Sequence, residues 1–228
     1  MKPLSSYFIA ALVIGLALPF LYEDELNIAT GLGLAGALWV ALTTLRDLFL
    51  RLKKGSKLTP SYTGMVMAHL GVAVFVAGVT VVISFDEERD LRMEPGSSYM
   101  VSDHEFRFLG VSKQKGPNYI ADEALIEVWK GGELRGVLKP QKRVYSGKGN
   151  PMTDASIDVG FMRDLYAALG EELGGGAWSM RVYYKPLIRW VWLGSLLMTI
   201  GGFLAISDRR YRQGVRQDKP GVAMAAGA

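Results

Sequence analysis

The chain has no cysteine, and histidine occurs only twice among its 228 residues, at His69 and His104. Without thiols, the sequence excludes disulfides, thiolate metal sites and thiol redox chemistry within these residues. With two imidazoles, acid–base and metal chemistry that needs histidine is narrowed to two positions. Charged side chains are also few, at 21% of residues against 50% that are hydrophobic. That balance predicts a protein that lies partly in a bilayer and partly in water.

Four apolar stretches are long enough to cross a hydrocarbon core, which takes about 20 residues of helix. They run over about residues 4–22, 28–45, 64–84 and 187–206. The third is the strongest, because no charged residue falls between Leu58 and Phe85. A cleaved signal peptide is the alternative for the first stretch, but the sequence that follows it is a poor cleavage site. We therefore expect four transmembrane helices, with residues 86–186 as a water-exposed insert and residues 207–228 as a basic tail.

The formal net charge of +4 comes mainly from two short basic segments. Residues 46–58 hold five lysines and arginines against one aspartate, and residues 208–219 hold five against two, whereas residues 23–25 are all acidic. Since cytoplasmic loops carry the excess of lysine and arginine, both termini and residues 46–58 are expected in the cytoplasm. Residues 86–186 then lie outside. Topology and contact with anionic membrane lipid account for the basic residues, so no nucleic-acid partner is expected.

Residues 86–186 alternate apolar and polar side chains over short segments, as half-buried strands do. The alternation is clear over His104–Leu109 and Ala177–Tyr184, and Gly131-Gly132 separates two further runs in the manner of a hairpin turn. We therefore expect a small β-rich domain, either a barrel or a sandwich, with at most a short helix.

The polar residues of this insert show no pair of nucleophile and base. His104 could act as a base, but it stands in a strand pattern beside acidic neighbours, so we expect an exposed histidine without a catalytic role. Asp154, Asp158 and Asp164 lack the spacing of a metal-binding loop, and a solvated strand face is the expected alternative.

His69 lies inside the third apolar stretch, where an ionisable side chain is costly and usually faces a partner, a cavity or a cofactor. Desolvation disfavours the cationic form of an imidazole in hydrocarbon, and a neutral imidazole is an axial ligand of haem iron. Gly64, Ala68, Gly71 and Gly78 form a stripe of small residues that lets another helix or a flat macrocycle come close. A hydrogen bond from His69 to a neighbouring helix is the alternative to a cofactor.

The position of His69 gives a further expectation. If the helix begins near Gly64, His69 lies about one and a half turns from its cytoplasmic end. The group that it binds is therefore expected toward the cytoplasmic leaflet.

Ordered blocks of sequence resemble one known family. The segment from Gly64 to Val74, with Ala68-His69-Leu70-Gly71 inside the membrane, resembles the late transmembrane histidine segment of cytochrome c maturation protein F, CcmF. Further blocks follow in the family's order: Pro140–Tyr145, Pro151–Asp158, Arg163–Tyr166, Ala168–Glu171, Ala177-Trp178, Lys185-Pro186, Arg189-Trp190, Trp192–Gly194 and Asp208–Arg212. Gln141 departs from the family, because an acidic residue is expected there.

The resemblance implies a membrane haem lyase of the bacterial cytoplasmic (inner) membrane, with residues 86–186 in the periplasm. Such a lyase receives haem from a periplasmic haem chaperone (CcmE-like) and attaches it to the CxxCH thiols of apocytochrome c. The resemblance further implies that His69 is one axial ligand of a structural b-type haem. It also implies partnership with apocytochrome-handling subunits (CcmH/CcmI-like).

The family is normally several hundred residues longer at its N-terminal side. The additional part carries a tryptophan-rich haem-handling motif, two flanking histidines and the second ligand of the b-type haem, none of which is found in these residues. We therefore expect a C-terminal portion, either a split subunit or a fragment, that partners the N-terminal part and is not active alone. The alternative is a non-catalytic membrane scaffold whose β-domain binds partners and whose histidine is structural.

Overall fold

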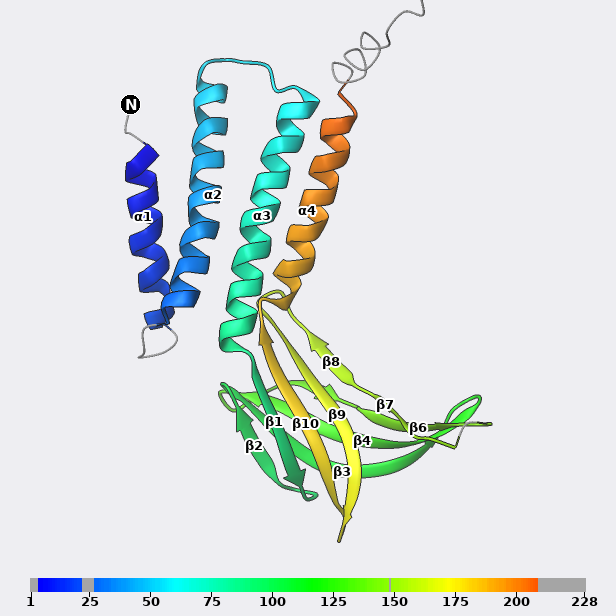
Figure 1. Ribbon diagram of the computed structural model, residues 1–228. Helices are drawn as coiled ribbons and strands as arrows, with labels where there is room; N and C mark the ends of the chain where they lie inside the picture. The colour runs from blue at the N-terminus through cyan, green and yellow to red at the C-terminus, as the bar shows by residue number, and fades with distance from the viewer. Residues whose placement is uncertain (1–3, 22–26, 148, 209–228) are drawn as a thin grey trace, which may run out of the picture. The chain divides into compact units, whose positions relative to one another are not determined.

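The computed structural model describes residues 4–21, 27–147 and 149–208. The chain divides into a helical unit, made of Met1–Ala77 and Val191–Ala228, and a β-rich unit, made of Gly78–Trp190 (Figure 1). The expected end of the first apolar stretch at Tyr22, the acidic loop Glu23–Glu25 and the basic tail from Arg209 lie outside the described residues.

The helices are α1 (Leu4–Ala17), which a 3₁₀ turn η1 (Leu18–Leu21) continues, α2 (Ile28–Lys53), α3 (Pro60–Phe85) and α4 (Ile188–Ile206). Helices α2, α3 and α4 are long and apolar enough to span a membrane, and α1 is a shorter apolar helix. Pro19 lies within η1, where its missing N–H and the clash of its ring with the carbonyl four residues earlier interrupt the regular α-helix. The expected fold class of membrane helices with an inserted β-domain is therefore confirmed, with three long helices and one short one.

Helices α2 and α3 both extend beyond their apolar centres because local capping groups set their ends. Asn27 begins α2, and its side chain accepts a hydrogen bond from Thr30 N at 3.1 Å. Thr59 precedes α3, and its Oγ1 accepts from Tyr62 N at 3.3 Å. Pro60 then occupies the first helical position, where its missing N–H has no partner to lose. At the end of α2, Gly55 adopts φ +64°, the left-handed conformation that lets the chain turn away.

Small residues allow the helices of this unit to pack closely. A Cβ added at Gly71 of α3 would lie 2.7 Å from Met198 N and 2.8 Å from Gly194 O of α4. A Cβ added at Gly194 would lie 2.5 Å from Phe75 N. The stripe of small residues on α3 is thus a helix-packing face. The sequence left open whether a helix or a flat macrocycle packs against this stripe, and in the structure helix α4 does.

The β-rich unit is a sandwich of two antiparallel sheets. Its strands are β1 (Glu87–Met93), β2 (Ser98–Val101), β3 (His104–Lys115), β4 (Tyr119–Lys130), β5 (Glu133–Leu138), β6 (Gln141–Tyr145), β7 (Met152–Asp154), β8 (Ser156–Val159), β9 (Arg163–Gly174) and β10 (Ala177–Pro186). One sheet has the order β1-β10-β9-β8, and the other has the order β2-β3-β4-β6-β7 with β5 also paired to β4. Between α3 and α4 the described residues contain strands and turns but no helix.

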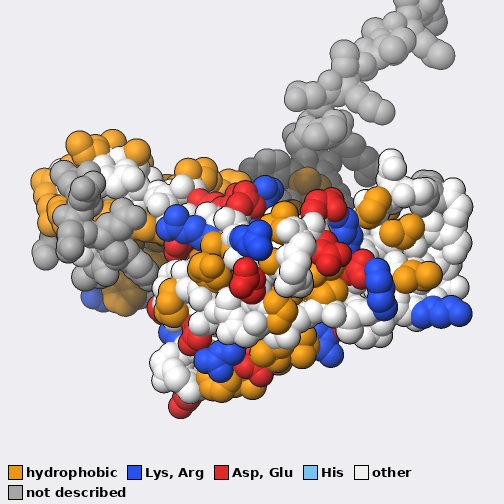
Figure 2. All heavy atoms as spheres, turned by 90° about the horizontal axis from the view of Figure 1, so that it is seen from below, with side chains coloured by type: hydrophobic (Ala, Val, Ile, Leu, Met, Phe, Trp, Pro, Cys, Tyr) orange, Lys and Arg blue, Asp and Glu red, His pale blue; other side chains and the backbone are white. Residues whose placement is uncertain are grey.

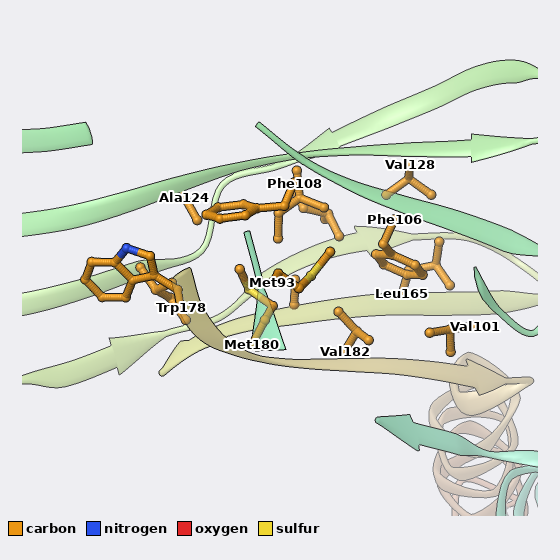
Figure 3. Close-up of a cluster of buried hydrophobic side chains, with 14 residues drawn as sticks. Met93, Val101, Phe106, Phe108, Ala124, Val128, Leu165, Trp178, Met180 and Val182 are labelled. Atoms are coloured by element: carbon orange, nitrogen blue, oxygen red, sulfur yellow. The ribbon is translucent and has the colours of Figure 1, made fainter. Parts of the chain in front are cut away.

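The core of the sandwich lies between the two sheets. Phe106 and Phe108 of β3 meet Met180 and Val182 of β10, and each of these side chains is fully buried (Figure 3). Full burial of a large apolar side chain contributes about 1.5–3 kcal/mol. The inward residues alternate with outward ones, as the sequence pattern predicts. On the outer face of the β-rich unit drawn in Figure 2, acidic and basic side chains are interspersed, so that face has no basic patch.

A buried lysine closes the free edge of β9. Strand β8 pairs with β9 only as far as Ala167, so the next carbonyls of β9 lack a strand partner there. Lys142 of β6, with 11% of its side chain exposed, donates from Nζ to Gly170 O at 3.2 Å and contacts the carboxylate of Glu171. Thr153 Oγ1 donates to Leu169 O at 3.4 Å. Side chains from the other sheet therefore satisfy the edge that neighbouring strands leave open.

Candidate functional site

His69 lies on an exposed face of α3. Met65 and Val72, one turn before and one turn after it, are 40% and 38% exposed on the same face. Gly71, on a different face, packs against α4. Helix α3 begins at Pro60, so His69 lies about two and a half turns into the helix rather than one and a half. The difference arises because Thr59 and Pro60 begin the helix before its apolar centre.

The orientation of the His69 ring is set by its own helix. Nδ1 lies 2.8 Å from the carbonyl oxygen of Met65. A carbonyl oxygen can only accept, so Nδ1 carries a proton, and in the neutral imidazole Nε2 then keeps its lone pair. A backbone carbonyl is a usual partner for the second nitrogen of a metal-bound histidine. The expected alternative, a hydrogen bond to a neighbouring helix, is not seen among the described residues, because the bond goes to Met65 instead.

The exposed Nε2 fits the position of an axial ligand, because the helix face around it is apolar and uncovered within the described residues. Helix α3 supplies one imidazole, and the described residues contain no group of three or more His, Cys, Asp or Glu side chains that could hold a metal ion. If a haem binds at this face, His69 Nε2 is the group on α3 that would hold its iron.

A polar cluster joins α2 to α3 about two turns before His69. The hydroxyl of Tyr62 donates to Asp47 Oδ2 at 2.7 Å. The guanidinium carbon of Arg51 lies 3.9 Å from the centroid of the Tyr62 ring, which is cation–π geometry. Ser61 N also donates to Asp208 Oδ2 at 3.2 Å, so a carboxylate that follows α4 by two residues lies at the N-terminus of α3. These contacts fix the first turns of the helix that carries His69.

His104 is buried, and the expectation of an exposed strand residue is wrong. The two-residue turn Ser102-Asp103 pairs His104 with Val101. In this strand register the imidazole points into the sandwich, and only 2% of the residue is exposed. Nδ1 lies 2.6 Å from Asp103 Oδ1 without hydrogen-bond geometry. Burial lowers the pKa of His104, and the attraction of Asp103 opposes that effect only in part. A side chain so enclosed has no route to a substrate, which fits a structural role.

Asp164 is buried, and the expectation of a solvated strand face is wrong for this residue. Only 4% of it is exposed, and its Oδ1 accepts from Gly160 N at 3.0 Å and from Arg189 Nε at 3.0 Å. Asp154 is exposed as expected, and Asp158 is half-buried in an ion pair with Arg163 at 2.6 Å. The alternation of polar and apolar residues gave no sign of the Arg189 partner, which lies 25 residues away in sequence.

Comparisons with known proteins agree with the fold. A family model described as "CcmF C-terminal beta-sandwich" matches residues 84–186. The chain is 46% identical over 212 residues to the cytochrome c-type biogenesis protein CcmF of Escherichia coli K12, covering 93% of this chain and 33% of that protein. It is 36% identical over 203 residues to the cytochrome c-type biogenesis protein ccl1 of Rhodobacter capsulatus, covering 86% of this chain and 31% of that protein.

A solved structure named "Cytochrome c Heme Lyase CcmF" has the same fold. It superposes with a TM-score of 0.74 at 19% identity, over 91% of this chain and 35% of that chain. The chain thus spans about a third of the length of the relatives that it matches. Together with the apolar helices, these relatives support an inner-membrane protein. The chain is therefore similar to the C-terminal part of CcmF proteins, the part that contains the β-sandwich.

Proposed function

We propose that this chain is the C-terminal part, or a separate subunit, of a membrane haem lyase that attaches haem to the CxxCH thiols of apocytochrome c. The relatives support a role in cytochrome c biogenesis, because they are named for it. Within the chain, the observation that carries the proposal is His69, an imidazole on an exposed apolar helix face whose Nδ1 is held by its own backbone and whose Nε2 is free to bind a metal.

In this proposal His69 Nε2 supplies one axial bond to a structural b-type haem. When bound, a haem places a redox-active iron at this face of α3. The Met65 carbonyl holds the imidazole in the correct tautomer and increases its basicity as a ligand. A second ligand to the iron, like the haem-handling residues, would belong to the N-terminal part of the lyase. For this reason the chain is not expected to be active alone.

The remaining assignments rest on charge and on the self-contained β-sandwich. The five basic residues of positions 46–58 favour a cytoplasmic loop, which puts both termini in the cytoplasm and residues 86–186 in the periplasm. There the β-rich unit would dock the CcmE-like haem chaperone, the CcmH/CcmI-like subunits or apocytochrome c. Since the sandwich has a complete core of its own, it can present a rigid surface to such partners.

The second candidate is a non-catalytic scaffold whose β-sandwich binds partners and whose histidine is structural. The self-contained core of the β-rich unit also favours this candidate. The two differ in what His69 does, because only the lyase proposal requires its Nε2 to bind iron.

Optical spectroscopy separates the two candidates. The chain is co-expressed with the N-terminal part of the lyase, and reduced spectra are recorded for the unaltered chain, His69→Ala and Val72→Ala. The lyase proposal expects a b-type haem signal that is lost in His69→Ala and kept in Val72→Ala, which shortens a side chain of the same helix face. A b-type signal that survives unchanged in His69→Ala contradicts the ligand assignment and leaves the scaffold.

A further inference from the structure

The loop between β8 and β9 exposes an unusual amount of apolar surface. Val159, the last residue of β8, and Phe161 and Met162 are 57%, 64% and 59% exposed, and Gly160 lies between them. None of the four carries a charge or a polar side chain. Isolated apolar side chains are normal on a protein surface, but adjacent ones at a loop tip indicate a site of contact.

This apolar loop, Val159–Met162, is hydrogen-bonded to the residue that precedes α4 and to the first turn of α4. Leu187 N donates to Met162 O at 2.8 Å, and Trp190 Nε1 donates to Phe161 O at 3.2 Å. The rings of Phe161 and Trp190 lie 5.7 Å apart between centroids. Leu187 adopts φ +51°, a conformation that L residues seldom take, so the turn from β10 into α4 depends on its neighbours. The loop and the start of the helix therefore form one rigid corner.

Buried charge holds the corner together. Asp164 accepts from Gly160 in the loop and from Arg189 in α4, so one carboxylate joins the two segments. Gly160 has no room for a side chain, because an added Cβ would lie 2.6 Å from Arg163 O. Arg163 is itself paired with Asp158 at 2.6 Å. The charges beside the loop are thus turned toward each other, and its apolar side chains point to the outside.

We propose that the Val159–Met162 loop inserts into the headgroup region of the bilayer that α4 crosses, as a membrane-contacting foot of the β-sandwich. Helix α4 is apolar and long enough to span, and tryptophan in the first turn of such a helix is typical of the membrane interface. A loop bonded to that first turn lies at the same depth. Its side chains carry the apolar chemistry that enters the boundary between headgroups and acyl chains.

The occupant of this surface is therefore phospholipid rather than a protein. Two backbone carbonyls and one aromatic ring of the loop contact the start of the spanning helix. The neighbouring cations, Arg163 and Arg189, are already paired with Asp158 and Asp164. The proposal uses neither the orientation of the chain nor haem binding, so it stands or falls independently of the proposed function.

Site-directed fluorescence tests the foot directly, because the chain has no cysteine to replace first. Single cysteines Phe161→Cys and Met162→Cys are labelled with an environment-sensitive probe, and the full chain is reconstituted in phosphatidylcholine–phosphatidylglycerol nanodiscs. The control is Leu173→Cys, an exposed apolar residue (45%) near the opposite end of β9. It lies ten positions along the strand from Arg163, about 33 Å at the usual rise.

Lipid with a spin label high on its acyl chain should quench the probes at 161 and 162 about twofold or more, and leave the probe at 173 unchanged. Equal quenching at 161 and 173 overturns the proposal. Emission at 161 that is shifted to the blue without quenching also overturns it, because protein then covers the loop. In a second variant, Phe161→Asp, the quenching of the probe at 162 should fall, while an unchanged circular dichroism spectrum verifies the fold.

Discussion

Replacing Gly71 by alanine should destabilise the helical unit, whereas the same replacement at Gly202 should not. An added Cβ at Gly71 would lie 2.7 Å from Met198 N, 2.8 Å from Gly194 O and 2.9 Å from Met198 Cγ. The first two atoms are backbone, so the helices α3 and α4 have to separate. At Gly202 nothing lies within 4 Å of an added Cβ. Comparing the two variants therefore separates the effect on helix packing from the effect that replacing glycine by alanine has on any helix.

The expected magnitudes follow from two opposing effects. Both replacements gain about 0.5–1 kcal/mol, because alanine restricts the unfolded chain more than glycine does. Only Gly71→Ala also incurs the cost of overpacking, about 1–3 kcal/mol in a well-packed interior. The two variants should therefore differ by about 1–3 kcal/mol in the free energy of unfolding.

Unfolding in mixed micelles of a mild detergent and increasing dodecyl sulfate, followed by circular dichroism, measures that difference. Equal stability of Gly71→Ala and Gly202→Ala would refute the close approach of α3 and α4. It would also remove the reason for placing His69 on the face that α4 leaves open.

Two further predictions concern the β-rich unit. Asp164→Asn should lower its free energy of unfolding by about 1–3 kcal/mol, since a buried acceptor shared by Gly160 and Arg189 loses its charge; chemical denaturation monitored by tryptophan fluorescence checks this, and the exposed Asp90→Asn should have a much smaller effect. Because burial holds the pKa of His104 below its usual 6.5, the unfolded chain binds the extra proton first, and stability should fall as the pH drops below 6.5. His104→Gln should flatten that dependence in thermal melts recorded across this range; an unaltered slope would show that another group titrates.

The membrane helices could be predicted from the sequence because an uncharged apolar run of about 20 residues seldom occurs outside a membrane-spanning helix. Their ends could not, since Thr59 and Pro60 begin α3 through hydrogen bonds and a fixed φ rather than through hydropathy. Alternation likewise predicted strands but left the choice between barrel and sandwich open. That choice depends on which strands pair at a distance, as β1 does with β10.

The candidate site shows the same division. The cost of an imidazole in hydrocarbon pointed to His69 without any knowledge of the fold. The alternation of polar and apolar residues could not predict which face of the sheet carries His104. One residue more or less in the preceding turn would move the side chain to the other face. The burial of Asp164 depends on Arg189, which only the folded chain brings to it.

The central claim is that His69 Nε2 binds a haem iron, and imidazole rescue tests it most directly. His69→Gly is co-expressed with the N-terminal part of the lyase, and the purified complex is titrated with free imidazole while the reduced spectrum is recorded. If His69 is the axial ligand, the b-type signal is lost or altered in His69→Gly and returns with imidazole. An unaltered b-type signal in His69→Gly before imidazole is added would contradict the claim.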